Sequence, residues 1–178
     1  MSLFVAAVCL LGLTGCDPAP AIYSPAPAPS STPIFKSDEE ALAAAKEAYE
    51  RYLEITNNSL NDDGLSRSKL DSVMTGEMLE ISTAKIDEAI AKGYHNIGGT
   101  ALKSISLQQY DRQSRGKSLI VVYACEDVSG VNFVDSEGNS LVSDDRKDTT
   151  LFETTFDLET DRKTVLISRH EPWSDQSC

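Results

Sequence analysis

The stretch SDEEALAAAKEAYERYLE at residues 37–54 decides how the first half of the chain folds. Apolar residues recur three and four positions apart with charged residues between them, which predicts an amphipathic helix over residues 37–56. These apolar residues are Leu42, Ala45, Tyr49, Tyr52 and Leu53. Ser37 and Glu40 have the spacing of a capping box, so the helix should begin at this point.

Beyond this helix, the spacing of apolar residues changes once along the chain, from a helical pattern to a strand pattern. Two further helices are predicted at residues 66–73 and 77–92, the second ending at Gly93. Beyond Gly93, short alternating runs of β-branched and aromatic residues predict strands. Their expected positions are residues 99–110, 118–126, 131–134, 149–158 and 164–170. Short turn-like joints favour an antiparallel meander, so the sequence predicts a single α+β domain with its helices on one sheet face.

The first residues, MSLFVAAVCLLGLTGC at 1–16, form an apolar run that is too short to span a membrane. Its end, LTGC, resembles the lipobox of bacterial lipoproteins, in which the cysteine, here Cys16, receives a diacylglycerol. The resemblance implies a signal peptide at 1–15 and lipid chains such as palmitate on Cys16. The alternative is an ordinary cleaved signal with an incidental cysteine. Because no Lys or Arg precedes Lys36, the true start is expected upstream of Met1.

Residues 16–34 are rich in Pro and Ala and lack any apolar period. Such a segment cannot bury a core, and polyproline II conformation would extend it by about 3.1 Å per residue. We therefore expect a tether that holds a folded domain, residues 35–178, away from the outer face of the bacterial cytoplasmic membrane.

Two cysteines remain once Cys9 leaves with the signal peptide and Cys16 is acylated. In an oxidising extracytoplasmic space, Cys125 and Cys178 should pair in a disulfide that fastens the C-terminus to a central strand. The functional alternative is that Cys125 is a nucleophile served by His95 or His170.

The chain is acidic, with a net charge of −12 and a sequence pI near 4.5. This charge argues against nucleic acid as a partner, because no basic stripe is present to neutralise phosphates. No spacing typical of a metal or cofactor site is found. Asp62, Asp63 and Gly64 do not fit a calcium loop, and Asp144, Asp145 and Asp148 lack ligand spacing and are expected in an exposed loop. Gly98 and Gly99 precede a strand and indicate a bulge or a close backbone approach.

The order of helices and strands resembles the nuclear transport factor 2-like, or cystatin-like, superfamily, and specifically uncharacterised lipoproteins of high-GC Gram-positive bacteria. Besides residues 37–54, the matching features are VMTGEMLE at 73–80, GGTALKSISL at 98–107, YACEDVSGV at 123–131 and a terminal cysteine after Trp173. The resemblance implies a curved sheet and helices that enclose a cleft. Tyr49, Tyr52 and His95 are the candidate cleft residues, although tyrosines at helical spacing more often belong to a core.

Two hypotheses about function follow. The first is a non-enzymatic surface module that binds an envelope protein or a small ligand. The second is a small lyase or isomerase with a His/Asp or Tyr/Asp pair in the cleft. His95 and His170 are expected on the rim or in loops, which favours the module. A deep cavity with convergent polar side chains would favour the enzyme.

Overall fold

A computed structural model describes residues 32–61, 66–159, 164–173 and 178. The chain divides after Ser30 into two units, and the described residues all belong to the second, Ser31–Cys178. The predicted signal peptide, Cys16, most of the tether and the segment 62–64 therefore lie outside the described residues.

Helix α1, Asp38–Asn58, forms where the apolar period predicted it. The Ser37 hydroxyl accepts a hydrogen bond from the Glu40 backbone N–H at 3.2 Å, and the Glu40 carboxylate accepts one from the Lys36 N–H at 2.8 Å. Side chains thus satisfy N–H groups at the helix start that have no partner within the helix. The predicted start of this helix is confirmed.

Two shorter helical elements follow. Residues Arg67–Ser72 form a 3-10 helix, η1, where an α-helix was predicted at 66–73. Helix α2, Gly76–Ala91, occupies nearly the predicted range. None of its residues is fully buried, although its neighbour α1 buries five. Helix α2 therefore packs less tightly than α1.

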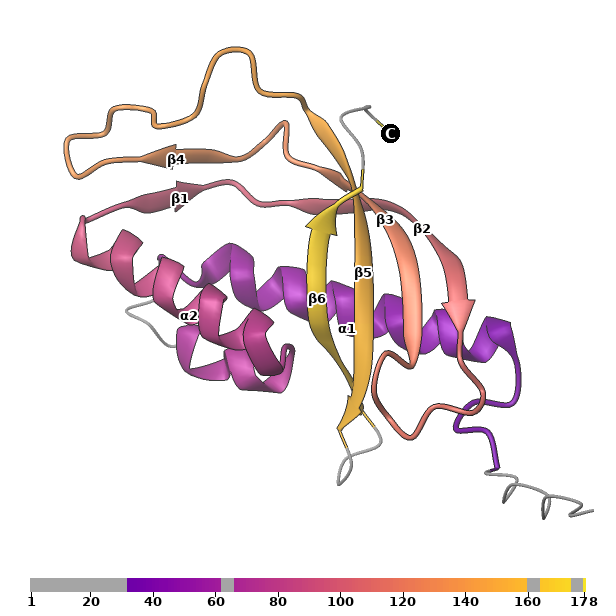
Figure 1. Cartoon of the computed structure of the whole chain (residues 1–178). Helices are drawn as coiled ribbons and strands as arrows, with labels where there is room; N and C mark the ends of the chain where they lie inside the picture. The colour runs from indigo at the N-terminus through magenta and orange to yellow at the C-terminus, as the bar shows by residue number, and fades with distance from the viewer. Residues whose placement is uncertain (1–31, 62–65, 160–163, 174–177) are drawn as a thin grey trace, which may run out of the picture. The chain divides into compact units, whose positions relative to one another are not determined.

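Four antiparallel strands form the main sheet, in the order β2-β3-β5-β6. Their bounds are Ala101–Tyr110 for β2, Ile120–Asp127 for β3, Thr149–Glu159 for β5 and Thr164–Pro172 for β6. Figure 1 shows α1 running across one face of this sheet, with α2 beside the β6 edge. An α+β domain with antiparallel sheets is thus confirmed.

The expected meander is wrong at one strand. Strand β4, Asn132–Val134, leaves the main sheet and pairs with β1, His95–Ile97, a strand that was not predicted. Gly98 follows β1 with φ +75°, and a Cβ atom at this position would lie 1.9 Å from the Gly130 carbonyl oxygen. The close backbone approach expected at Gly98 is confirmed, and it joins the two strands of this β1–β4 arm.

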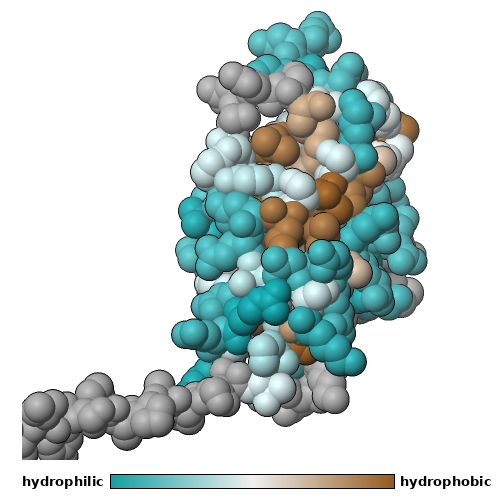
Figure 2. All heavy atoms as spheres, turned by 90° about the vertical axis from the view of Figure 1, so that its right-hand side faces the viewer, coloured by the Kyte–Doolittle hydropathy of each residue, from teal (hydrophilic) through white to brown (hydrophobic). Residues whose placement is uncertain are grey.

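The core lies between α1 and the main sheet. Small residues of α1, Ala41, Ala45 and Ala48, are fully buried and let the helix approach the strands closely. Large apolar residues from three strands complete this layer, including Ile120, Phe156 and Ile167. Seen from the β2 side of the domain, apolar side chains also form a band bordered by hydrophilic ones (Figure 2).

The opposite face of β3 carries the disulfide between Cys125 and Cys178, which confirms the predicted pairing. The bond makes Cys125 unavailable as a nucleophile. On the same side Trp173 is 52% exposed and lies against Tyr123, with 5.0 Å between ring centroids. The end of the chain is thereby fixed to the outer side of the sheet. No helix within the described ranges has the length and apolarity that crossing a bilayer requires.

Candidate functional site

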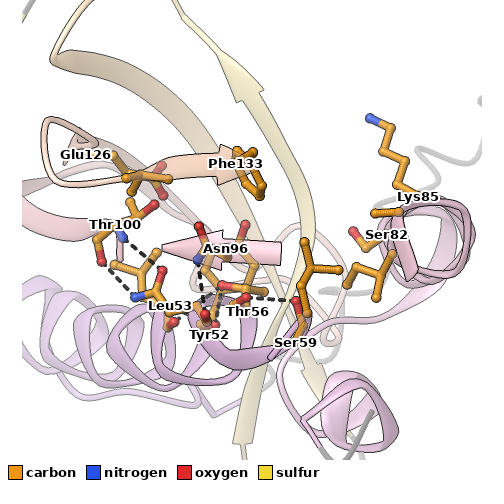
Figure 3. Close-up of a pocket in the computed structure, with 15 residues that line it drawn as sticks. Tyr52, Leu53, Thr56, Ser59, Ser82, Lys85, Asn96, Thr100, Glu126 and Phe133 are labelled. Atoms are coloured by element: carbon orange, nitrogen blue, oxygen red, sulfur yellow. Dashed lines mark hydrogen bonds between the residues drawn. The ribbon is translucent and has the colours of Figure 1, made fainter. Parts of the chain in front are cut away.

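A cavity of about 330 Å³ lies between α1, α2 and the β1–β4 arm. Figure 3 shows side chains converging on it from each of these elements, with Glu126 and Phe133 on one side and Ser82 and Lys85 of α2 on another. Its polar lining residues are Tyr52, Thr56, Asn57, Ser59, Ser82, Lys85, Asn96, Thr100 and Glu126. The apolar ones are Leu53, Leu60, Ile86, Ala89, Val131 and Phe133. The cavity therefore combines apolar walls with several polar groups, as ligand sites do.

Glu126 is the most unusual residue of this lining, because it is a carboxylate that is only 6% exposed. It lies on β3 in register with the buried residues Ile120, Val122 and Ala124, since alternate residues of a strand face the same side. Its Oε1 accepts a hydrogen bond from the Tyr49 hydroxyl at 2.8 Å. Burial raises the pKa of Glu126 above its usual value, and the Tyr49 hydrogen bond opposes this only in part.

His170 lies next to Glu126, with 3.6 Å between its Nε2 and Glu126 Oε1. Its Nδ1 lies 2.9 Å from the hydroxyl of the fully buried Thr154, and its ring stacks on Phe152. The side chain is 9% exposed, and burial lowers its pKa to about 4. The imidazole is therefore neutral at neutral pH. The expectation that His170 sits on a rim or in a loop is wrong.

A bulge explains why His170 faces inward. Strict alternation from Ile167 would place Arg169 inside and His170 outside. However, Phe156 pairs with Ile167 while Thr155 pairs with Arg169, so Ser168 is an extra residue on β6. The extra residue reverses the alternation beyond it and turns His170 towards α1. The local sequence gives no signal for this bulge.

Two tyrosines of α1 complete the cluster. The ring of Tyr49 lies 5.7 Å from that of Tyr52, and Tyr52 lies 5.5 Å from the His170 ring. Tyr52 lines the cavity, whereas Tyr49 is fully buried behind it and holds Glu126. Burial first, and then the neighbouring Glu126, raise the pKa of both hydroxyls. Both tyrosines therefore stay protonated and serve as hydrogen-bonding groups.

Asparagine side chains fasten the β1–β4 arm to the end of α1. Asn57 donates to the Thr100 carbonyl at 2.9 Å and accepts from the Thr100 N–H at 2.8 Å. Asn61 makes the same pair of bonds with the Asn96 backbone, at 2.6 and 3.1 Å. These paired bonds hold β1 and the residues after it against the C-terminal end of α1.

The cavity continues towards the β6 edge. An adjoining space of about 500 Å³ is lined by His170 and Phe152 and shares Tyr52, Ser82 and Lys85 with the first. Residues of helix α2, none of them fully buried, line both spaces. The Glu126–His170 pair thus lies where the two spaces meet.

Of the three predicted cleft residues, the structure brings Tyr49 and Tyr52 to this site but not His95. His95 is an exposed residue of β1 and lines a separate hollow of about 340 Å³ with Arg67 and Tyr94. Glu126 was not predicted, although the alternating run from Ile120 to Glu126 already placed it on the buried face. In the described part of the chain, no group of three His, Cys, Asp or Glu side chains is arranged to hold a metal ion.

No protein family and no curated protein matches the chain. Among solved structures, it is similar to the intermembrane space region of the chloroplast protein ARC6, at 16% identity and a TM-score of 0.55. That match covers 74% of this chain and 95% of the other. A designed β-sheet protein is 14% identical over 78% of this chain and 94% of its own length, with a TM-score of 0.32. At these identities, the likeness to the ARC6 region supports the α+β fold and nothing about function.

Proposed function

We propose that the chain is a lipoprotein anchored through Cys16 to the outer face of a bacterial cytoplasmic membrane, and that its domain, of the nuclear transport factor 2-like type, binds a small ligand. The observation that carries the binding role is the cavity with Glu126 buried in its wall. A cavity of about 330 Å³ is within the usual size range of small-molecule sites. The tether would present this site to the extracytoplasmic space.

The acid–base properties of the site favour ligand binding over catalysis. A general base is most effective with a pKa near the working pH. Burial lowers the pKa of His170 to about 4, so it is a weak base. The tyrosine pKa values are raised, so Tyr49 and Tyr52 are poor acids.

Three small probes with the same ring test this proposal: benzylamine, benzyl alcohol and benzoate. At least one should shift the amide NMR signals of Tyr52, Asn96 and Glu126 in the purified full-length protein. Ala89→Phe should abolish the shifts by filling the cavity, because Ala89 lines it. Ala84→Phe, on the exposed side of α2, is the matched control and should leave them unchanged. If no probe perturbs these residues, the cavity is not a ligand site.

The anchor is tested separately, because Cys16 lies outside the described residues. Cys16→Ser removes the thiol that would carry the lipid. The variant should leave the membrane fraction or remain uncleaved, and it should lack the mass of the acyl chains. A variant that stays with membranes as the unaltered chain does would contradict the lipid anchor.

One observation favours a second candidate, a lyase or isomerase: Glu126 and His170 lie 3.6 Å apart at the cavity. A carboxylate with a raised pKa is a suitable base for a proton next to a carbonyl group. If this candidate is correct, the protein should speed exchange of the α-protons of cyclohexanone in D₂O, and Glu126→Gln should remove the effect. Exchange at the buffer rate supports binding alone.

A further inference from the structure

Among the described residues, Glu126 has no Lys or Arg as a partner, and its neighbour His170 is a cation only when protonated. Its carboxylate has about four acceptor positions, yet the described residues supply it with one hydrogen bond, from Tyr49, and a neighbouring neutral imidazole. Within the described ranges, no Lys or Arg forms an ion pair with it. Burial of a carboxylate without a counter-ion is unfavourable, because the charge loses its hydration and gains no opposite charge in return. A ligand that carries a positive charge would supply the missing partner.

A second unmet acceptor lies in the same lining. The side-chain N–H groups of Asn96 donate to the carbonyls of Asn57 and Gly98, at 3.1 and 3.3 Å. Both partners are acceptors, so they fix which way the amide points. Asn96 Oδ1 is consequently buried without a donor among the described residues. Beside Glu126, the described wall of the cavity thus contains a second acceptor without a donor.

The remaining walls suit an organic cation. The rings of Tyr52 and Phe133 line the cavity, and aromatic faces attract cations. Leu53, Ile86 and Val131 offer apolar contact to the body of such a molecule. A water molecule takes a share of about 30 Å³ in the liquid, so the space, about 330 Å³, holds a molecule of several heavy atoms.

Among the lining residues that the structure describes, Lys85 is the one charged group that would favour an anion. Figure 3 shows it on α2, across the pocket from Glu126. Lys85 is exposed, so solvent and salt screen its charge. Glu126 is buried, so its charge acts with little screening. The buried Glu126 carboxylate therefore favours a ligand with a positive charge.

From these contacts we infer that the cavity binds a small organic amine, whose ammonium group pairs with the Glu126 carboxylate while its apolar body lies against Tyr52 and Phe133. This inference rests on the proposed ligand-binding function and specifies the chemical class of the ligand.

Calorimetric titration of the full-length protein with benzylamine and benzyl alcohol tests it, because the two probes differ chiefly in charge. Benzylamine should bind at least tenfold more tightly. Glu126→Gln should remove that difference and leave benzyl alcohol within twofold of its original affinity. Glu50→Gln, on the exposed side of α1, is the matched control and should alter neither affinity.

The outcomes separate the two proposals. If benzyl alcohol binds as tightly as benzylamine, the ligand class is wrong while the binding site stands. The same holds if Glu126→Gln binds benzylamine as the unaltered chain does. If neither probe binds and no cavity signal shifts, the ligand-binding function itself fails. Thermal unfolding of Glu126→Gln shows whether the variant is folded.

Discussion

Glu126→Gln should stabilise the protein at neutral pH. The substitution keeps the size of the side chain and an acceptor for the Tyr49 hydroxyl, which now lies 2.8 Å from Oε1. It removes a charge whose burial is unfavourable by several kcal/mol, as an order of magnitude. The Tyr49 hydroxyl bonds less strongly to a neutral amide than to a carboxylate, and this offsets about 1 kcal/mol of the stabilisation. A net increase of roughly 2 kcal/mol in the free energy of unfolding remains, or roughly 6 °C in Tm for a domain of this size.

The pH dependence of this stability difference independently tests whether Glu126→Gln stabilises the domain. A carboxyl group with a raised pKa in the folded state lowers stability once the pH exceeds its unfolded-state pKa, because the unfolded chain then releases the proton more readily, and this loss is complete above the raised pKa. The advantage of Glu126→Gln over the unaltered chain should therefore shrink as the pH falls and vanish near pH 4. Urea unfolding at pH 7, 5.5 and 4 measures it. A variant that is less stable than the unaltered chain at every pH would refute the reasoning, because Glu126 would then be a stabilised ion.

Asp157 provides a matched comparison, since it is a buried carboxylate that has donors. It accepts from Lys117 Nζ at 3.0 Å, from the Ser118 N–H at 2.7 Å and from the Ser168 hydroxyl at 3.1 Å. Asp157→Asn should destabilise the domain by about 1–3 kcal/mol. The substitution replaces one carboxylate oxygen by an NH₂ group, which would face the donors that this oxygen now accepts from. Opposite effects at the two positions would show that missing partners, rather than burial alone, make Glu126 unfavourable.

Three further predictions concern stability. In the Glu126→Gln variant, the lowered pKa of His170 should reduce the free energy of unfolding by about 3 kcal/mol as the pH falls from 6.5 to 4, since each pKa unit is worth about 1.4 kcal/mol. A free energy from urea unfolding that stays constant over this pH range would contradict the burial of His170. Cys178→Ala opens a loop with a sequence separation of 53 from Cys125 and should lose about 4 kcal/mol in urea unfolding, whereas an unchanged midpoint would exclude a stabilising disulfide. Gly98→Ala places a methyl group against a carbonyl at positive φ and should lower Tm by several degrees, and a neutral result would contradict this backbone approach.

Elements whose signals are local could be predicted from the sequence. The period around Tyr49 and the capping pair of Ser37 and Glu40 placed α1 almost to the residue. Alternation placed the strands of the main sheet within a few residues. The pairing of Cys125 with Cys178 followed from counting thiols.

Features that depend on distant contacts could not be predicted. Strand β1 has three residues and no alternating pattern of its own, and it is held by its pairing with β4 and by hydrogen bonds from Asn61, which follows α1. His170 was expected at the rim because it stands at the end of the last strand, and the bulge at Ser168 that turns it inward has no local signal. Glu126 had a usable signal, its place on the inner face of β3, but an acidic residue at the end of a strand is usually solvated.

The Glu126 carboxylate is buried in the wall of an open cavity, and among the described residues it accepts one hydrogen bond, from Tyr49. A carbon-13 NMR titration of the Glu126 side-chain carboxyl measures this directly. The account predicts a midpoint above the ordinary 4.5, and a fall in that midpoint when benzylamine is present. A midpoint at or below 4.5 without ligand would contradict it, because the carboxylate would then already have the partners that we assign to a ligand.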